Sequence, residues 1–322
     1  MNEPAPALPD LPALWDDASA ENPLDSRAEA PSGPPRTPPD PWTALRRLTP
    51  ARIALGRAGT SLPTSEVLRF AAAHAQARDA VHLPLDAAAL EADLRARGHA
   101  VLQARSRAAT RTEYLVRPDL GRVLDDASRA ALQAQRAAAG PVDLCLVVGD
   151  GLSAVAAQRH APALVAALAA ALGGDGDGPG DRGDEGRENV EGDPRAAPGA
   201  VRIGPVVIAT QARVALADEI GQCLGAALAL ILLGERPGLS SPDSLGAYLT
   251  WAPAPGHAEA ERNCVSNIRP EGQPVPEAAA RLAWLVRAAL RLRVTGIGLK
   301  DESEMASLAA PGPGSLGSAA GR

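Results

Sequence analysis

Lysine is almost absent from this sequence of 322 residues: Lys300 is the only one, and the other 31 basic residues are arginines. Because Lys300 does not follow a glycine-rich loop, the lysine-containing phosphate-binding loop of nucleotide hydrolases is excluded. Aromatic residues make up only 2 % of the chain, too few to provide the stacked rings with which proteins bind single-stranded nucleic acid. The core must therefore be built from Ala, Leu, Val and Ile.

Cysteines and long apolar runs are scarce as well. The chain has three cysteines at wide spacing: Cys145, Cys223 and Cys264. An odd number so far apart is typical neither of a disulfide framework nor of a zinc site. The longest apolar run, residues 226–233, is far shorter than the ~20 residues of a membrane span, and no secretory signal opens the chain. The five histidines have no metal-ligand spacing. We expect a cytoplasmic protein that binds neither membrane nor nucleic acid.

The net charge of −6 is unevenly distributed along the chain. Residues 1–40 carry a net charge of −6 and residues 173–199 a net charge of −5, which leaves the remainder mildly basic at +5. This positive charge suits an anionic ligand or an acidic partner, but it is spread too diffusely for a DNA-binding surface.

Residues 1–41 contain eleven prolines and many acidic residues, a composition that predicts a disordered tail. Leu8, Leu11, Leu14 and Trp15 lie at roughly helical spacing within it. An incidental apolar cluster is the simpler interpretation of these residues. The alternative is a short helix that folds on a partner.

Residues 42–140 predict a helical N-terminal region. One helix is expected at 63–81, a second at 87–97 with Asp86 as its N-cap, and a third from about 119 to 140. A short strand-like piece lies at 112–116. We place the boundary to a second domain after residue 140.

Residues 141–302 predict an α/β domain. Residues 142–148 are a nearly continuous apolar strand, followed by a glycine turn at 149–151 and a helix at 152–172. Further strands are expected at 206–209, 227–233 and 246–251, and further helices at 213–224 and 276–292. Alternating strands and helices predict a doubly wound, mainly parallel sheet with flanking helices, whose ligands bind beyond the carboxyl ends of the strands.

Two further segments fall outside this pattern. Residues 173–199 are rich in glycine and acidic residues, which indicates a low-complexity insertion between a helix and a strand. Residues 303–322 are expected to form a flexible C-terminal tail.

Three segments could carry chemistry. The turn at 149–153 could hold an anion on its amides, although an ordinary tight turn looks the same. Residues 234–238 place Glu235 and Arg236 where doubly wound folds bind ligands, or else in an exposed turn with a weak ion pair. Residues 261–270 form a polar stretch predicted to be a loop, in which Cys264 lies between Arg262 and Arg269. Such a thiol is either a nucleophile of lowered pKa or a partly buried group, and a third interpretation is that the segment forms a surface for a large, amide-rich ligand.

Taken together, these segments resemble one family, the small subunit of ethanolamine ammonia-lyase, over about residues 43–302. The most distinctive are Gly-Glu-Arg-Pro-Gly at 234–238 and Asn-Cys-Val-Ser-Asn-Ile-Arg at 263–269. The other matching residues are 106–107, 113–121, 148–154, 213–221, 239–245, 262 and 270.

The resemblance implies an enzyme that depends on adenosylcobalamin and converts ethanolamine to acetaldehyde and ammonia by a radical mechanism. Its substrate pocket would lie in a large partner subunit, so we expect no catalytic residue and no metal ligand in this chain. Val214, Glu235 and Cys264 match the family's cobalamin contacts. N-terminal tails of this family can direct enclosure in a bacterial microcompartment, for which residues 8–15 would be the candidate.

Two other classes of function stay open at this point. A nucleotide-cofactor enzyme of the Rossmann type would need a better glycine fingerprint than residues 149–151 provide. A non-catalytic assembly protein is suggested only by the docking-like residues of the tail.

Overall fold

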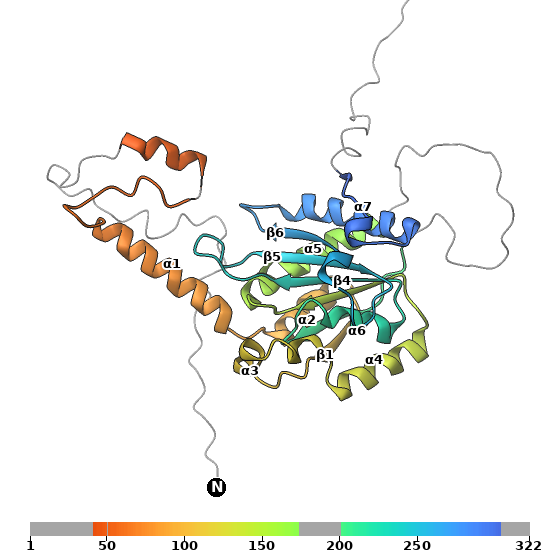
Figure 1. Ribbon diagram of the computed structural model, residues 1–322. Coiled ribbons are helices and arrows are strands. Elements are labelled where there is room, and N and C mark those ends of the chain that lie inside the picture. The colour runs from red at the N-terminus through yellow and green to blue at the C-terminus, as the bar shows by residue number, and fades with distance from the viewer. Residues whose placement is uncertain (1–40, 50, 174–200, 304–322) are drawn as a thin grey trace, which may run out of the picture. The chain divides into compact units, whose positions relative to one another are not determined.

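The computed structural model describes residues 41–49, 51–173 and 201–303 (Figure 1). Most of the predicted N-terminal tail, nearly all of the 173–199 insertion and the C-terminal tail lie outside the described residues. The chain divides into two compact units, Met1–Arg69 and Phe70–Arg322, which are described separately.

The first unit contains a 3₁₀ helix, η1 (Pro41–Leu48), and the start of helix α1 (Thr64–His82). Pro63 precedes α1 and Glu66 lies in its first turn, both of which favour a helix start. The predicted helix at 63–81 is therefore confirmed. None of the residues between 42 and 69 that the structure describes is buried.

The second unit is built on a six-stranded sheet with the strand order β1-β3-β2-β4-β5-β6. The first four strands in this order are parallel, and β5 and β6 are antiparallel to their neighbours. The predicted α/β class with a mainly parallel sheet is therefore confirmed. The strands are β1 (Val101–Arg105), β2 (Leu144–Gly149), β3 (Val206–Thr210), β4 (Leu228–Gly234), β5 (Leu245–Trp251) and β6 (Arg262–Ile268).

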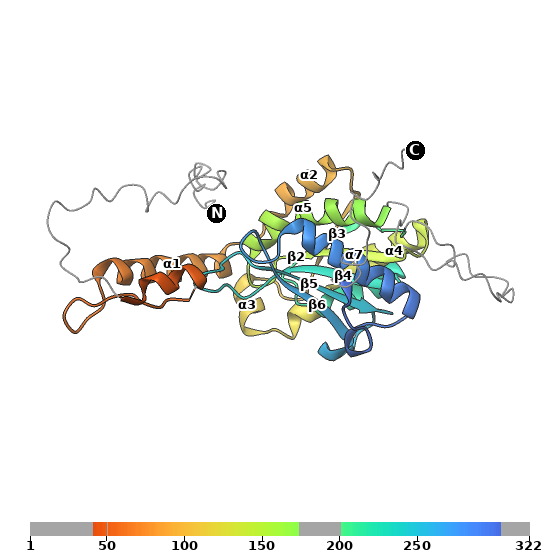
Figure 2. The same cartoon turned by 90° about the horizontal axis from the view of Figure 1, so that it is seen from above.

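Helices cover both faces of the sheet. Leu144, Leu146 and Val148 of β2 pack with α2 (Ala87–Ala96), α5 (Ala154–Gly173) and α7 (Val275–Leu292). Cys145 and Val147, which point to the opposite face, pack with α4 (Asp126–Ala139) and α6 (Leu216–Leu224). Figure 2 shows α5 and α7 side by side. A strand buried on both faces requires apolar residues at every position, which explains the unbroken apolar run of β2.

Side-chain caps fix where two of these helices begin. Asp86 accepts a hydrogen bond from the Ala89 amide at 2.9 Å and starts α2 at its predicted position. Asp125 accepts one from the Ser128 amide at 2.7 Å. Since this second cap starts α4 at residue 126, the helix begins later than the predicted residue 119.

Three local predictions are wrong. Residues 112–116 form a helix, α3 (Arg111–Val116), because Thr110 accepts a hydrogen bond from the Glu113 amide at 3.2 Å and caps it. Residues 101–105 form β1, a short edge strand that was not predicted within the helical region. Residues 262–268 form the edge strand β6 rather than a loop, since an edge strand can expose polar side chains. The domain boundary after residue 140 stays a prediction.

One helix among the described residues, α5, is long and apolar enough to span a membrane by length and composition. Ten of its residues are buried in the core. Its apolar character therefore reflects its burial against the sheet and alongside α7.

Candidate functional site

The carboxyl ends of β2 and β4 form a topological switch point. The two strands are parallel neighbours, but the chain leaves β2 towards β3 and leaves β4 towards β5, on the other side. Loops that diverge in this way leave a crevice between them, which is where open α/β sheets bind their ligands.

Two glycines allow the loops that follow these strands to touch. Gly151 has a positive φ of 55°, and a Cβ there would overlap the carbonyl oxygen of Gly234. A Cβ on Gly234 would in turn overlap the carbonyl of Ser153. The amide of Leu152 donates to the Gly234 carbonyl at 2.8 Å and joins the loops directly.

A cleft of about 450 Å³ opens beside this contact, and we call it the carboxyl-edge cleft. Two of the residues predicted from the sequence, Val214 and Glu235, line it together. Leu152, Leu233 and Gly234 form part of its wall. The sequence also placed Arg236, another lining residue, in the candidate ligand-binding turn beside Glu235, but it did not assign the remaining lining residues to the site: Tyr114, Arg213 and Tyr248.

Glu235 is held by one carboxylate oxygen and leaves the other available. Its Oε2 accepts hydrogen bonds from the Ser244 hydroxyl and, at 3.2 Å, from the Asn267 amide. Its Oε1 accepts no hydrogen bond from the described residues. A Cβ on residue 246 would lie 2.8 Å from Oε1, so Gly246 provides the space that this oxygen occupies. The available oxygen can accept a ligand N–H.

Val214 is positioned by a clamp on the loop between β3 and α6. The carboxylate of Asp150 accepts hydrogen bonds from the amides of Gln211 and Ala212, each at 2.9 Å. The Arg111 guanidinium lies 3.3 Å from it. Burial raises the pKa of Asp150, and these donors oppose that shift. The turn after β2 thus fixes the neighbouring loop.

Tyr114 lies between two arginines at one side of the cleft. The guanidinium carbons of Arg111 and Arg213 are 4.8 and 4.3 Å from its ring centroid. The tyrosine hydroxyl donates to the Ala212 carbonyl at 2.9 Å. The Arg213 Nε is buried and has no hydrogen-bond partner among the described residues. No sequence pattern singles out this stack, since its members come from two distant segments.

Cys264 lies next to the cleft rather than in its lining. It pairs across β5 and β6 with Tyr248, which does line the cleft. Burial raises the pKa of the Cys264 thiol, the hydrogen bond to Tyr248 partly offsets the rise, and Glu235 adds to it. The hypothesis of a nucleophile with a lowered pKa is therefore wrong.

The two neighbouring arginines do not activate this thiol because both are paired elsewhere. Arg262 forms a buried ion pair with Asp218 at 2.7 Å and also donates to Thr250 at 2.9 Å. Arg269 pairs with Glu271 at 2.6 Å. Both guanidiniums therefore form structural ion pairs and do not stabilise a thiolate at Cys264.

The loop that follows Glu235 is anchored at its far end. Asp243 lies 2.7 Å from the Arg159 guanidinium and 3.3 Å from His160, both on α5. The hydrogen bond with His160, followed by the charge of Arg159, holds the pKa of Asp243 well below its usual range. The Ser153 hydroxyl donates to the Pro242 carbonyl at 2.8 Å and adds a second anchor. The described residues hold no cluster of His, Cys, Asp and Glu that could bind a metal ion.

Comparison with known proteins shows the family of the chain. The family model of the ethanolamine ammonia-lyase light chain matches residues 39–177 and 193–300. The chain belongs to the ethanolamine ammonia-lyase small-subunit family.

Several small subunits of this family are about half identical to the chain. That of Ralstonia nicotianae is 52 % identical over 273 residues, which cover 84 % of this chain and 92 % of the relative. That of Bradyrhizobium diazoefficiens is 52 % identical over 269 residues, 84 % and 94 % of the two chains. That of Azotobacter vinelandii is 50 % identical over 280 residues, 86 % and 95 %.

Membership identifies the chain as the small subunit of an ethanolamine ammonia-lyase, one component of a hetero-oligomeric enzyme with a large-subunit partner. The nucleotide-cofactor enzyme and the assembly protein are therefore set aside. The ethanolamine ammonia-lyase match begins at residue 39 and omits residues 178–192. The residues that the match leaves out, those before 39 and residues 178–192, fall in the segments predicted to be a tail and an insertion.

Proposed function

We propose that the carboxyl-edge cleft is this chain's part of an adenosylcobalamin site that it shares with the large subunit. The observation that carries the proposal is Glu235. One of its oxygens is fixed by Ser244 and Asn267, and the other is available at the switch point of the sheet, beside Val214.

The chemistry of the cleft fits this cofactor. Cobalamin carries primary amides around its rim and a phosphodiester in its nucleotide loop, so it needs acceptors, donors and apolar contacts together. Glu235 offers an acceptor, Arg213 and Arg236 offer donors, and Val214 and Leu152 offer apolar surface. A cleft of about 450 Å³ encloses only part of so large a molecule, which agrees with a site divided between two subunits.

The roles of the chain follow from these contacts. When bound, adenosylcobalamin supplies the adenosyl radical with which the family converts ethanolamine to acetaldehyde and ammonia. In this chain Glu235 orients the cofactor, Val214 packs against its rim, and Cys264 fills space beside Tyr248 as a protonated thiol. None of the three acts on the substrate, which we place in the large subunit.

Replacing the carboxylate tests the proposal. We expect Glu235→Ala to weaken cobalamin retention by about 1–3 kcal/mol, about 5- to 150-fold, because the cofactor's amide donors lose their acceptor. The measurement is corrin absorbance in the co-eluting complex of both subunits. Glu277→Ala, which removes an exposed carboxylate at the start of α7, is the matched control. Equal retention by the two variants would remove Glu235 from the site.

We further infer a cytoplasmic location, with enclosure of the enzyme in a bacterial microcompartment through its N-terminal tail. The candidate residues 8–15 lie outside the described residues, so the inference rests on the apolar spacing in the sequence and on the family.

A further inference from the structure

Arg213 differs from the other covered arginines of the chain because it has no carboxylate partner. Six of the described arginines are partly or fully buried: Arg111, Arg129, Arg213, Arg262, Arg269 and Arg281. Five of them form an ion pair within the described residues, and Arg213 forms none there. Withdrawing a charge from water is costly unless an opposite charge accompanies it. The covered guanidinium of Arg213 therefore calls for an anion that the described residues do not supply.

Arg213 is held at the carboxyl-edge cleft by the segment that includes α3. Its backbone amide donates to the Gly121 carbonyl at 2.9 Å, and its Nη2 donates to the Tyr114 carbonyl at 3.2 Å. A Cβ on Gly121 would lie 2.9 Å from the Arg213 Cγ, so this glycine makes room for the side chain. Together with the stacking on Tyr114, these contacts position the guanidinium before any ligand binds.

Most of the hydrogen-bonding capacity of this guanidinium is unused. An arginine side chain has five N–H donors, and within the described residues that of Arg213 makes only the Nη2 contact with Tyr114. Its Nε is buried and has no partner there. Unpaired buried donors are rare in native proteins and are typical of groups with a functional role. A planar guanidinium of this kind binds a phosphate or a carboxylate through paired hydrogen bonds.

The cleft around Arg213 has an excess of positive charge. Arg213 and Arg236 line it with a single carboxylate, that of Glu235. Arg236 is exposed, so water screens its charge more strongly than that of the partly buried Arg213. Arg213 is therefore the stronger of the two candidate anion sites.

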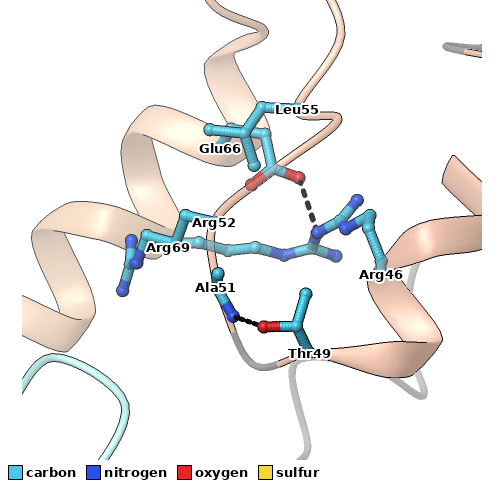
Figure 3. Close-up of a pocket in the computed structure, with 7 residues that line it drawn as sticks. All are labelled: Arg46, Thr49, Ala51, Arg52, Leu55, Glu66 and Arg69. Carbon is cyan, nitrogen blue, oxygen red and sulfur yellow. Dashed lines mark hydrogen bonds and ion pairs between the residues drawn. The ribbon is translucent and has the colours of Figure 1, made fainter. Parts of the chain in front are cut away.

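A second arginine-lined cleft, which lies in the first unit, shows the opposite arrangement. It has a volume of about 300 Å³, and Glu66 points towards Arg46 within it (Figure 3). Glu66 lies 3.5 Å from Arg46 and 2.9 Å from Arg69, so the chain itself supplies the anion. Arginines that line a cleft are thus not left unpaired throughout this protein, and the state of Arg213 is specific to the carboxyl-edge cleft.

We propose that Arg213 forms the phosphate subsite of the carboxyl-edge cleft and binds the phosphodiester in the nucleotide loop of cobalamin. The inference rests on the cofactor proposed above. The amides around the corrin rim are neutral, whereas the phosphodiester carries the negative charge that Arg213 needs as a partner. Glu235 and Arg213 thus bind different parts of the cofactor. The carboxylate accepts from rim amides, and the guanidinium donates to the nucleotide loop.

Two corrinoids that differ by one phosphate test the proposal. Cobinamide lacks the nucleotide loop, and cobinamide phosphate restores the phosphate without the ribose and the base. Corrin absorbance after equilibrium dialysis against the complex of both subunits gives their dissociation constants. We expect the parent complex to bind cobinamide phosphate at least about tenfold more tightly. Arg213→Gln should reduce this preference to less than about twofold, and Arg213→Lys, which keeps the charge but loses the planar fork, should retain about threefold or more.

Three controls accompany this comparison. Arg291→Gln removes an exposed arginine from the last turn of α7 and should keep the parent's preference. Glu235→Ala should weaken the binding of both corrinoids and leave their ratio unchanged, because it acts on the rim amides. Assembly of the two subunits without a corrinoid should be the same for Arg213→Gln and the parent chain.

Each contrary outcome has a distinct meaning. Equal binding of the two corrinoids by the parent complex, or a preference that survives Arg213→Gln, would overturn the phosphate subsite. Weaker assembly of Arg213→Gln without a corrinoid, with an unchanged circular dichroism spectrum, would identify the anion as a carboxylate of the large subunit. Binding of neither corrinoid nor cobalamin by the parent complex would overturn the cofactor proposal itself.

Discussion

At the scale of single residues, the structure separates groups that hold the fold from groups that face the cleft. Arg262 and Arg269 flank Cys264 in the sequence, but ion pairs with Asp218 and Glu271 hold their charges elsewhere. Sequence spacing alone could not show this, because the partners come from α6 and from beyond β6. The same limit hid the stacking of Arg213 on Tyr114, which depends on a contact between distant segments.

The raised pKa of the Cys264 thiol predicts slow alkylation at neutral pH. Cys145 and Cys223 are buried, so iodoacetamide labelling of the folded chain should report on Cys264. We expect the labelling rate to rise only above the pKa of a free thiol, about 8.5, because the thiolate is the reactive form. Cys264→Ser gives the background rate. A midpoint below that of a free thiol would contradict the raised pKa.

At the scale of elements, the apolar strands were the most predictable part of the fold. β2, β3 and β4 lie within two residues of their predicted bounds because buried parallel strands leave an unbroken apolar run. The edge strands β1 and β6 were missed, since pairing on one side only places little constraint on composition. Side-chain caps account for two further differences: Thr110 caps α3, which was predicted to be a strand, and Asp125 starts α4 later than predicted.

The anchor of the β4–β5 loop gives a prediction at this scale. Asp243→Asn should lower the free energy of unfolding at pH 7 by about 1–3 kcal/mol, since Arg159, His160 and Arg269 lose the carboxylate they share. The pKa of Asp243 is lower in the folded state, so its contribution is complete above the unfolded value of about 3.9 and is lost as the pH falls below it.

Urea denaturation of both chains at pH 7 and near pH 3 measures this effect. The difference in unfolding free energy between Asp243→Asn and the parent chain should shrink at the lower pH. Asp119→Asn, which breaks only an exposed ion pair with Arg117, is the control and should change little at either pH. A difference that grows on acidification would contradict the assignment.

At the scale of the whole molecule, the sequence predicted the class of the sheet and two residues that share one cleft. The resemblance named Val214, Glu235 and Cys264, and the fold brings the first two together and places the third beside Tyr248. The place of Arg213 in the cleft, and the lack of burial across residues 42–69, could not be foreseen. Both depend on how far a side chain is covered, which periodicity does not reveal.

The acidic tail gives a prediction for the chain within a cell. If it directs enclosure, residues 1–41 fused to a fluorescent protein should colocalise with microcompartment shell proteins, because the apolar spacing at 8–15 would form a docking helix. The same fusion with Leu11→Asp and Leu14→Asp should stay diffuse. A diffuse signal from the unaltered fusion would favour an incidental cluster.

The contact between Gly151 and Gly234 has a consequence for the order of assembly. Together with the grip of Asp150 on the β3–α6 loop, it makes this wall of the cleft rigid in the small subunit alone. The conformational entropy of the two loops is thus lost during folding, before any ligand arrives. Cofactor binding then requires no ordering of this wall, so any conformational change that accompanies it is expected in the large subunit, which completes the site.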